Sequence, residues 1–127
     1  CSSDLTPRKR ILLVDDDEAV LEFLEAKLTP HYDVVVSGSA DQALALARAE
    51  RPDLVLCDIE LPGMDGGDVS AALFLQAETH DVPLVFLTAL VTPAELAARG
   101  HQLGGRAAIS KQSPFEEILA RLRAVLG

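Results

Sequence analysis

Five polar residues each follow a short, nearly continuous apolar run: Asp15, Asp16, Asp58, Thr88 and Lys111. Such a run, rich in β-branched residues and leucine, is typical of a strand that is buried on both faces of a parallel sheet. Ligands of open α/β sheets bind at the carboxyl ends of these strands. We therefore expect the three carboxylates, the hydroxyl and the ammonium group to converge on one crevice.

This set of side chains is suited to phosphoryl transfer. Carboxylates that lie close together repel one another, and a hard divalent cation such as Mg²⁺, which prefers oxygen ligands, removes the repulsion. A carboxylate can also be the nucleophile toward a phosphoryl group. Catalysis of such a transfer consists mainly of positioning and charge neutralisation. Mg²⁺, the Lys111 ammonium and the Thr88 hydroxyl could each bind one phosphoryl oxygen.

Each residue also has a simpler explanation when it is taken alone. Asp is a preferred N-cap residue, and we expect Asp17 to cap the helix that follows it. Asp58 could be a turn residue, and a lone lysine after a strand usually faces solvent. The functional hypothesis depends on the joint occurrence of complementary groups at four strand ends.

The elements that must position these residues follow from hydrophobic periodicity. The predicted strands are 11–14, 34–36, 54–57, 84–87 and, more weakly, 107–110. The predicted helices are 18–28, 41–51, 68–76, a fourth that opens with the capping box 92–95, and a fifth that opens at 113–116. Gly104-Gly105 is interpreted as the end of the fourth helix.

Strand and helix thus alternate five times, which predicts a parallel sheet with helices on both faces. Right-handed crossovers restrict the topology to a doubly wound α/β fold. We expect a five-stranded, flavodoxin-like (β/α)5 sheet with the strand order 2-1-3-4-5. The 127 residues fit one domain, with a flexible N-terminal segment at 1–9 and the folded domain at 10–127.

The composition restricts the partners and the compartment. A net charge of −9 disfavours binding to nucleic acid or to an anionic membrane through this domain. No apolar run approaches the roughly 18 residues that a transmembrane helix needs, and no signal peptide is recognisable. The two cysteines, Cys1 and Cys57, do not suggest a disulfide framework, so we expect a cytoplasmic protein.

The chain resembles the receiver domains of two-component response regulators. The resemblance covers about residues 9–126. It is carried by ILLVDDD at 11–17, LVLCDIELPGMDG at 54–66, LTA at 87–89 and SK at 110–111. The second of these segments is highly specific, whereas the others are weak alone and strong in combination.

The resemblance implies a role for each acidic position. Asp58 is expected to be the phosphoacceptor. Asp15 and Asp16 are expected to hold Mg²⁺ together with Asp58, with the backbone carbonyl of Glu60 as a further ligand. No enzymatic activity is expected beyond the domain's own phosphoryl transfer and dephosphorylation.

The resemblance also implies how the phosphoryl group is supplied and sensed. Thr88 is expected to move toward the phosphoryl group, and Lys111 is expected to pair with it. The donor would be a histidine of a kinase or of a phosphotransfer protein. In such domains the helix-strand-helix surface near the last strand usually carries the output, so an unknown output domain or protein is a second expected partner.

Three departures from the family pattern affect the region around Lys111. The family usually has proline directly after the lysine, and here Gln112 predicts a trans peptide bond and a differently shaped loop. The aromatic residue that usually lies three positions before the lysine is replaced by Ala108, which predicts an atypical output coupling. The stretch 88–111 is about one residue longer than is common.

Glu60 and Leu90 occupy the positions two after Asp58 and two after Thr88, where the family tunes its own dephosphorylation. A carboxylate beside a phosphoryl group repels an incoming anion, and leucine cannot orient a water molecule. These two residues therefore predict a long-lived phosphorylated state.

Two alternatives remain open from the sequence. The first is a phosphorylation-independent interaction module with the receiver fold, which Ala108 and Gln112 favour. The second is a phosphohydrolase of the haloacid-dehalogenase type that uses Asp15 as nucleophile. The segment 15–17 has that family's two aspartates, but Ala19 stands at the fifth position and no cap segment is evident.

Overall fold

The computed structural model describes residues 8–61, 63 and 65–126. The strands in this part of the chain are β1 Arg10–Val14, β2 Asp33–Ser37, β3 Leu54–Asp58, β4 Leu84–Thr88, β5 Gln102–Leu103 and β6 Arg106–Ser110. The helices are α1 Glu18–Leu28, α2 Ala40–Glu50, α3 Gly66–Leu75, α4 Pro93–Ala98 and α5 Phe115–Leu126. The predicted helices and strands are all present, with ends shifted by at most two residues except for the end of the fourth helix.

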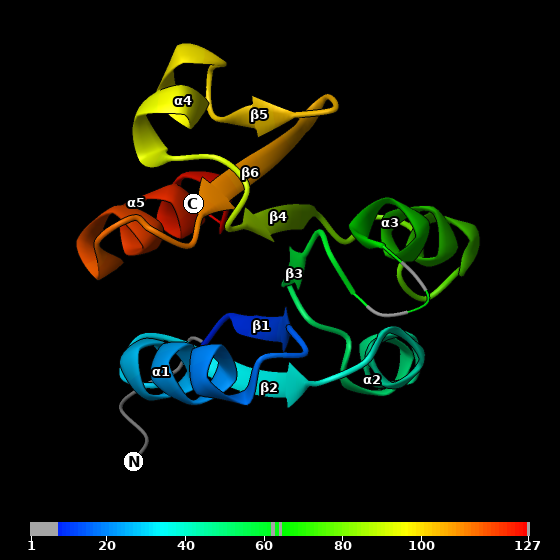
Figure 1. Ribbon diagram of the computed structural model, residues 1–127. Coiled ribbons are helices and arrows are strands. Elements are labelled where there is room, and N and C mark those ends of the chain that lie inside the picture. The colour runs from blue at the N-terminus through cyan, green and yellow to red at the C-terminus, as the bar shows by residue number, and fades with distance from the viewer. Residues whose placement is uncertain (1–7, 62, 64, 127) are drawn as a thin grey trace.

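The strands form one sheet in the order β2-β1-β3-β4-β6-β5 (Figure 1). The first five strands of that order are parallel and correspond to the predicted order 2-1-3-4-5, which confirms the doubly wound, flavodoxin-like fold. The additional strand, β5, is only two residues long and runs antiparallel to β6 at the edge of the sheet.

The glycine pair at 104–105 produces this additional strand. Both glycines have positive φ, 57° at Gly104 and 81° at Gly105, as the two central residues of a tight hairpin turn require. The prediction that this pair ends the fourth helix is therefore wrong. Helix α4 ends earlier, at Ala98, and the left-handed residue Gly100 follows it. The His101 N–H donates to the carbonyl of Leu96 there, as in a Schellman-type helix end.

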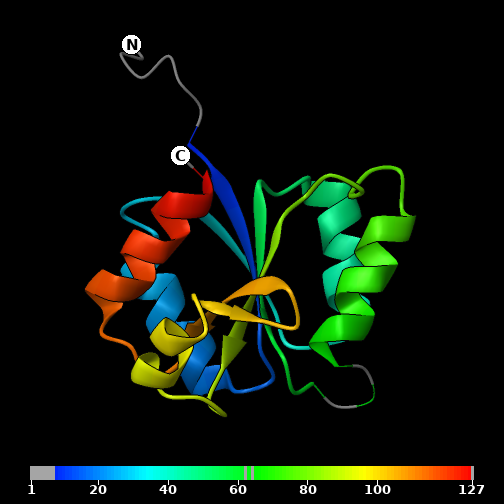
Figure 2. The ribbon, with the colours of Figure 1, turned by 90° about the horizontal axis from the view of Figure 1, so that it is seen from above.

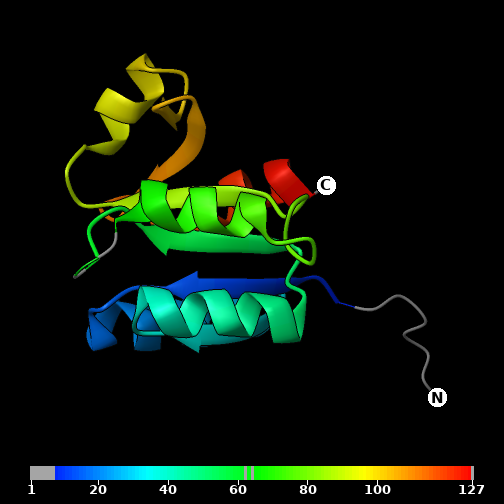
Figure 3. The same ribbon diagram turned by 90° about the vertical axis from the view of Figure 1, so that its right-hand side faces the viewer.

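Helices cover both faces of the sheet (Figure 2). Helices α1 and α5 lie on one face, and α2 and α3 lie side by side on the other (Figure 3). Alternate residues of each central strand face opposite layers, so that Ile11 and Leu13 contact the α1–α5 layer while Leu12 and Val14 contact the α2–α3 layer. This two-sided burial is the reason why the strands are continuous apolar runs in the sequence.

The helix start nearest to the site is fixed by a side-chain cap. The Asp17 carboxylate accepts the N–H of Ala19 at 2.9 Å, which confirms Asp17 as the N-cap of α1. The connection from β1 to α1 is consequently only three residues long, and this holds Asp15 and Asp16 at the end of the sheet.

Only part of the N-terminal segment is described. Of the segment 1–9 that the sequence predicts to be flexible, residues 1–7 lie outside the described residues. The Arg8 guanidinium donates to the carbonyls of Thr29 and Tyr32. Within the described part of the chain, none of the helices has the length and apolar character that crossing a membrane requires.

Candidate functional site

The carboxyl ends of β1, β3, β4 and β6 lie next to one another in the sheet. Asp58 and Thr88 are the last residues of β3 and β4, and Asp15 and Lys111 directly follow β1 and β6. The parallel register aligns these ends at one edge, as the sequence predicts. The residues named from the sequence are thereby brought together in one place.

Three carboxylates form a cluster at this edge. Oxygen atoms of Asp15, Asp16 and Asp58 all lie within 4.8 Å of one another. Asp15 is fully buried and Asp58 is 4% exposed, whereas Asp16 is exposed to solvent. Such a set, with two buried carboxylates and one that remains open to water, fits the oxygen ligands and retained waters of a Mg²⁺ site. Asp17 is not part of this cluster, because its side chain caps α1.

Lys111 supplies the positive charge of the site. Its Nζ lies 2.7 Å from Oδ2 of Asp15 and 3.3 Å from Oδ2 of Asp58. Among the described residues, the buried Oδ2 of Asp15 has no partner other than this ammonium group. Burial by itself lowers the pKa of Lys111, but the hydrogen bonds and charges of Asp15 and Asp58 outweigh it and raise the pKa. The lysine is therefore held in its charged form.

The surroundings of Asp58 make its negative charge costly. Burial raises the pKa of this carboxyl above its usual value, and the nearby charge of Asp15 raises it further. The N–H of Glu60 and the Lys111 ammonium act in the opposite direction but do not cancel the effect. A cation bound beside Asp58 would relieve this cost.

Asp15, Asp58 and Thr88 each use one side-chain oxygen to accept a nearby backbone N–H. A side-chain oxygen accepts the N–H two residues further on in the pairs Asp15–Asp17 at 3.0 Å, Asp58–Glu60 at 3.1 Å and Thr88–Leu90 at 2.9 Å. In both aspartates this uses Oδ1 and leaves Oδ2 directed to Lys111. The Thr88 hydroxyl acts as the acceptor of its bond, so its proton remains available for donation.

The structure locates Glu60 beside the site through its N–H bond to Asp58, with its side chain exposed. A metal-binding role for its carbonyl remains a prediction.

The loop after Lys111 contains Gln112, and the described residues include no cis peptide bond, which confirms the trans prediction. Ala108 is buried and lies opposite Phe86 of β4.

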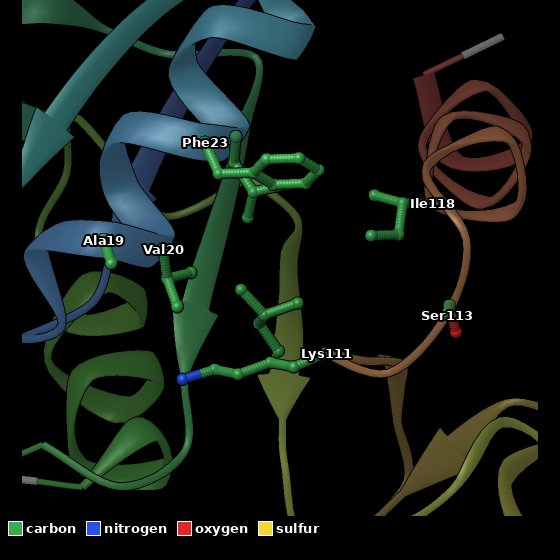
Figure 4. Close-up of a pocket in the computed structure, with 8 residues that line it drawn as sticks. Ala19, Val20, Phe23, Lys111, Ser113 and Ile118 are labelled. Atoms are coloured by element: carbon green, nitrogen blue, oxygen red, sulfur yellow. The ribbon is translucent and has the colours of Figure 1, made fainter.

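Sequence reasoning did not identify a cavity that adjoins the site. The cavity has a volume of about 220 Å³ and lies between α1 and α5 (Figure 4). Its lining is mainly apolar and comprises Ala19, Val20, Phe23, Leu24, Leu87, Lys111, Ser113 and Ile118. The aliphatic stem of Lys111 lies along it, and the ammonium end points toward the carboxylates. Phe23 of α1 lines this cavity and is 52% exposed. In the sequence, the one sign of the cavity was this large apolar residue on the predicted helix.

Comparison with known protein families identifies the class. The family model of the response regulator receiver domain matches residues 11–123. The chain therefore belongs to the response regulator receiver domain family, which confirms the resemblance noted in the sequence. It is a signalling domain rather than a conventional enzyme. Neither the haloacid-dehalogenase alternative nor the phosphorylation-independent module is favoured by this membership.

Particular relatives extend the comparison. The chain is 41% identical over 122 residues to the DNA-binding response regulator MtrA of Mycolicibacterium smegmatis, which covers 95% of this chain and 52% of MtrA. It is 37% identical to the response regulator PleD of Caulobacter vibrioides over 91% of this chain and 26% of PleD. The chain thus spans about half the length of MtrA, and less of PleD.

Solved structures agree with this assignment. The chemotaxis protein CheY4 of Vibrio cholerae superposes with a TM-score of 0.79 at 26% identity, over 94% of this chain and 99% of CheY4. The BeF3-activated receiver domain of RstA from Klebsiella pneumoniae gives a TM-score of 0.76 at 37% identity, over 93% of this chain and 98% of that chain.

Proposed function

We propose that this receiver domain is a cytoplasmic switch in which Asp58 accepts a phosphoryl group from a phosphohistidine. The observation that carries the proposal is the position of Asp58 Oδ2. This oxygen, on a side chain that is 6% exposed, lies 3.3 Å from the Lys111 ammonium in a cluster of three carboxylates. The donor is a histidine kinase or a histidine phosphotransfer protein.

The donor set supports Mg²⁺ as the cofactor. Asp15, Asp16 and Asp58 would hold the ion, with the backbone carbonyl of Glu60 as a further ligand. When bound, the ion would neutralise charge on the carboxylates and on the phosphoryl oxygens. The fit rests on a buried carboxylate oxygen of Asp15 whose one partner, within the described part of the chain, is the Lys111 ammonium.

The geometry of the protein groups supports a direct transfer. Oδ2 of Asp58 attacks phosphorus and forms an O–P bond as the P–N bond to the donor histidine breaks, and the electron pair of that bond returns to the imidazole. The Lys111 ammonium can then bind a phosphoryl oxygen, because it already lies beside the attacking atom. The Thr88 hydroxyl donates its free proton to another phosphoryl oxygen.

The partners of the switch follow in part from charge. With a net charge of −9, this domain offers little attraction for nucleic acid phosphates or anionic lipids, so we propose neither as a direct partner. MtrA is described as DNA-binding and is about twice as long as this chain. Any DNA binding would be a property of a segment other than this domain.

Glu60 and Leu90 support slow loss of the phosphoryl group. Both side chains are exposed, and the backbone N–H groups of Glu60 and Leu90 donate to two residues of the site, Asp58 and Thr88. The Glu60 carboxylate would repel an incoming anion, and the isobutyl group of Leu90 cannot orient an attacking water. Replacing Leu90 with Gln is expected to shorten the lifetime of the phosphorylated form, measured as the decay of the phosphorylated mass with Mg²⁺ present. Rapid decay of the unaltered protein would contradict this part of the proposal.

The test of the function is intact-mass measurement after incubation with acetyl phosphate and Mg²⁺. We expect the protein to gain one phosphoryl group, and Asp58→Asn to gain none. Asp17→Asn is the matched control and should still be labelled. Asp17 belongs to the same run of three aspartates in the sequence, but its side chain caps α1. A phosphoryl group found on Asp15 would support the haloacid-dehalogenase reading, and no labelling at all would support a phosphorylation-independent module.

A further inference from the structure

A common turn follows every parallel strand of the sheet. At each strand end a side-chain oxygen accepts the N–H two residues further on, in the pairs Asp15–Asp17, Ser37–Ser39, Asp58–Glu60, Thr88–Leu90 and Ser110–Gln112. Three of the acceptors belong to the site described above. The other two, Ser37 and Ser110, carry no reacting group. Ser110 directly precedes Lys111 in the chain, whereas Ser37 contacts the site through its carbonyl, which accepts the N–H of Asp15 at 3.1 Å.

Ser110 makes two bonds that span Lys111. It is the last residue of β6, is 1% exposed and lies opposite Thr88 in the register of the sheet. Its Oγ accepts the N–H of Gln112 at 3.1 Å, and its carbonyl accepts the N–H of Ser113 at 3.1 Å. The main chain after Lys111 is therefore folded back onto the residue before it.

The backbone of Lys111 is fixed from the other side as well. Its N–H donates to the carbonyl of Thr88 at 2.7 Å, which extends the pairing between β4 and β6 by one residue. With the backbone held, the aliphatic stem runs along the cavity between α1 and α5, and Nζ reaches Oδ2 of Asp15 at 2.7 Å. A lysine side chain has several rotatable bonds, so the backbone direction at Lys111 decides whether the ammonium reaches both carboxylates.

The bond from Gln112 to Ser110 depends on both partners. Gln112 has a backbone N–H that a proline at the same position would lack, and Ser110 provides the buried acceptor. We propose that Ser110 is a positioning residue for Lys111, whose hydroxyl sets the loop that directs the ammonium to Asp15 and Asp58. This inference rests on the proposed function only in so far as Lys111 assists phosphoryl transfer.

The first test compares rates of labelling by acetyl phosphate with Mg²⁺. Ser110→Ala is expected to lower the rate about fivefold, the effect of losing one hydrogen bond that holds a reacting group. Ser110→Thr retains the hydroxyl and should restore the rate. Ser37→Ala is the matched control, since this serine is also 1% exposed and accepts the N–H of Ser39, and it should react like the unaltered protein. Equal rates for Ser110→Ala and the control would overturn the proposal.

The route through Lys111 is tested by combination. In a Lys111→Ala background, adding Ser110→Ala should cause no further loss of rate, because the residue that it positions is gone. A further fivefold loss would show that the hydroxyl acts by another route. Gln112→Pro removes the donor of this bond and leaves the buried serine unaltered. It should show the same loss of rate, and it keeps the test available if Ser110→Ala folds poorly.

Urea unfolding without metal separates this inference from the proposed function. The effects of Ser110→Ala and Lys111→Ala on the urea midpoint should be less than additive if the hydroxyl positions the lysine. If the midpoints are less than additive, the positioning role is supported. If the unaltered protein is at the same time not labelled, the phosphoacceptor function is refuted while the positioning role stands. Additive midpoints with normal labelling of Asp58 would refute the positioning role alone.

Discussion

The ion pairs of Lys111 allow a quantitative prediction for the metal-free protein. At separations of 2.7 Å and 3.3 Å and an effective dielectric constant of about 20, the gross attractions to Asp15 and Asp58 are about 6 and about 5 kcal/mol. Most of this gain is offset by the cost of burying the charges, since the side chains of Lys111 and Asp15 are 18% and 0% exposed. The consequence of Lys111→Met is therefore set by the two carboxylates that it leaves without a cation.

Removal of one partner of a buried ion pair costs about 3–5 kcal/mol. We expect the lower end, about 3 kcal/mol, for Lys111→Met, because Lys111 is partly exposed and because Asp58 can take up a proton. The measurement is the free energy of unfolding in urea, followed by circular dichroism at neutral pH with EDTA. Lys27→Met serves as control, since Nζ of Lys27 lies 5.9 Å and 6.0 Å from the rings of Phe23 and Phe115, and such contacts are worth at most about 1 kcal/mol at exposed sites.

Addition of Mg²⁺ provides the second half of this test. A divalent cation should stabilise Lys111→Met more than the unaltered protein, because the ion no longer competes with the ammonium group for the carboxylates. If Lys111→Met is as stable as the Lys27→Met control in EDTA, the reasoning about unpaired carboxylates is refuted.

Three further predictions concern other parts of the molecule. Because burial and then Asp15 raise the pKa of Asp58 in the folded state, its contribution to stability is present below the unfolded value of 3.8 and is lost as pH rises through the raised value. Asp58→Asn should thus be more stable than the unaltered protein at neutral pH in EDTA, and the difference in urea midpoint should shrink toward pH 3.8; a difference that grows on acidification would contradict this sign. Burial, followed by the charges of Asp58 and Asp15, raises the pKa of the Cys57 thiol to about 12, so in a Cys1→Ser protein a thiol reagent at neutral pH should react only after unfolding; prompt reaction of the folded protein would show that the strand opens. Gly105→Ala should reduce the free energy of unfolding by about 1 kcal/mol, because this hairpin position has a φ of 81°. Gly67→Ala, which is within a helix where alanine has the higher propensity, should cost less; equal losses for both would indicate that the hairpin turn does not need glycine.

Much of the fold and of the candidate site could be predicted from the sequence, for identifiable physical reasons. Strands buried on both faces are continuous apolar runs, and a parallel sheet brings their carboxyl ends together. Asp58 and Lys111 could therefore be placed in one crevice before any distance was known. The capping residues Asp17 and Thr92 could be identified because a cap needs only a local sequence pattern.

The features that were not predicted depend on short or ambiguous signals. Strand β5 has two residues and so has no periodicity, and a Gly-Gly pair can end a helix or form a hairpin turn with equal ease. The cavity beside Lys111 arises from packing between α1 and α5, which lie at opposite ends of the chain. The bond from Gln112 to Ser110 depends on a rotamer and a loop conformation that residue types alone do not specify.

The short hairpin strand has a consequence for how this domain can associate with other chains. In a sheet that ended at β6, an unpaired row of N–H and C=O groups would be open to a strand from a neighbouring molecule. Gln102 and Leu103 pair with Ala107 and Arg106, and the carbonyl of His101 accepts the N–H of Ala108 at 3.0 Å. The hairpin thus leaves a strand of only two residues at this border, which offers a strand of another chain few N–H and C=O groups to pair with.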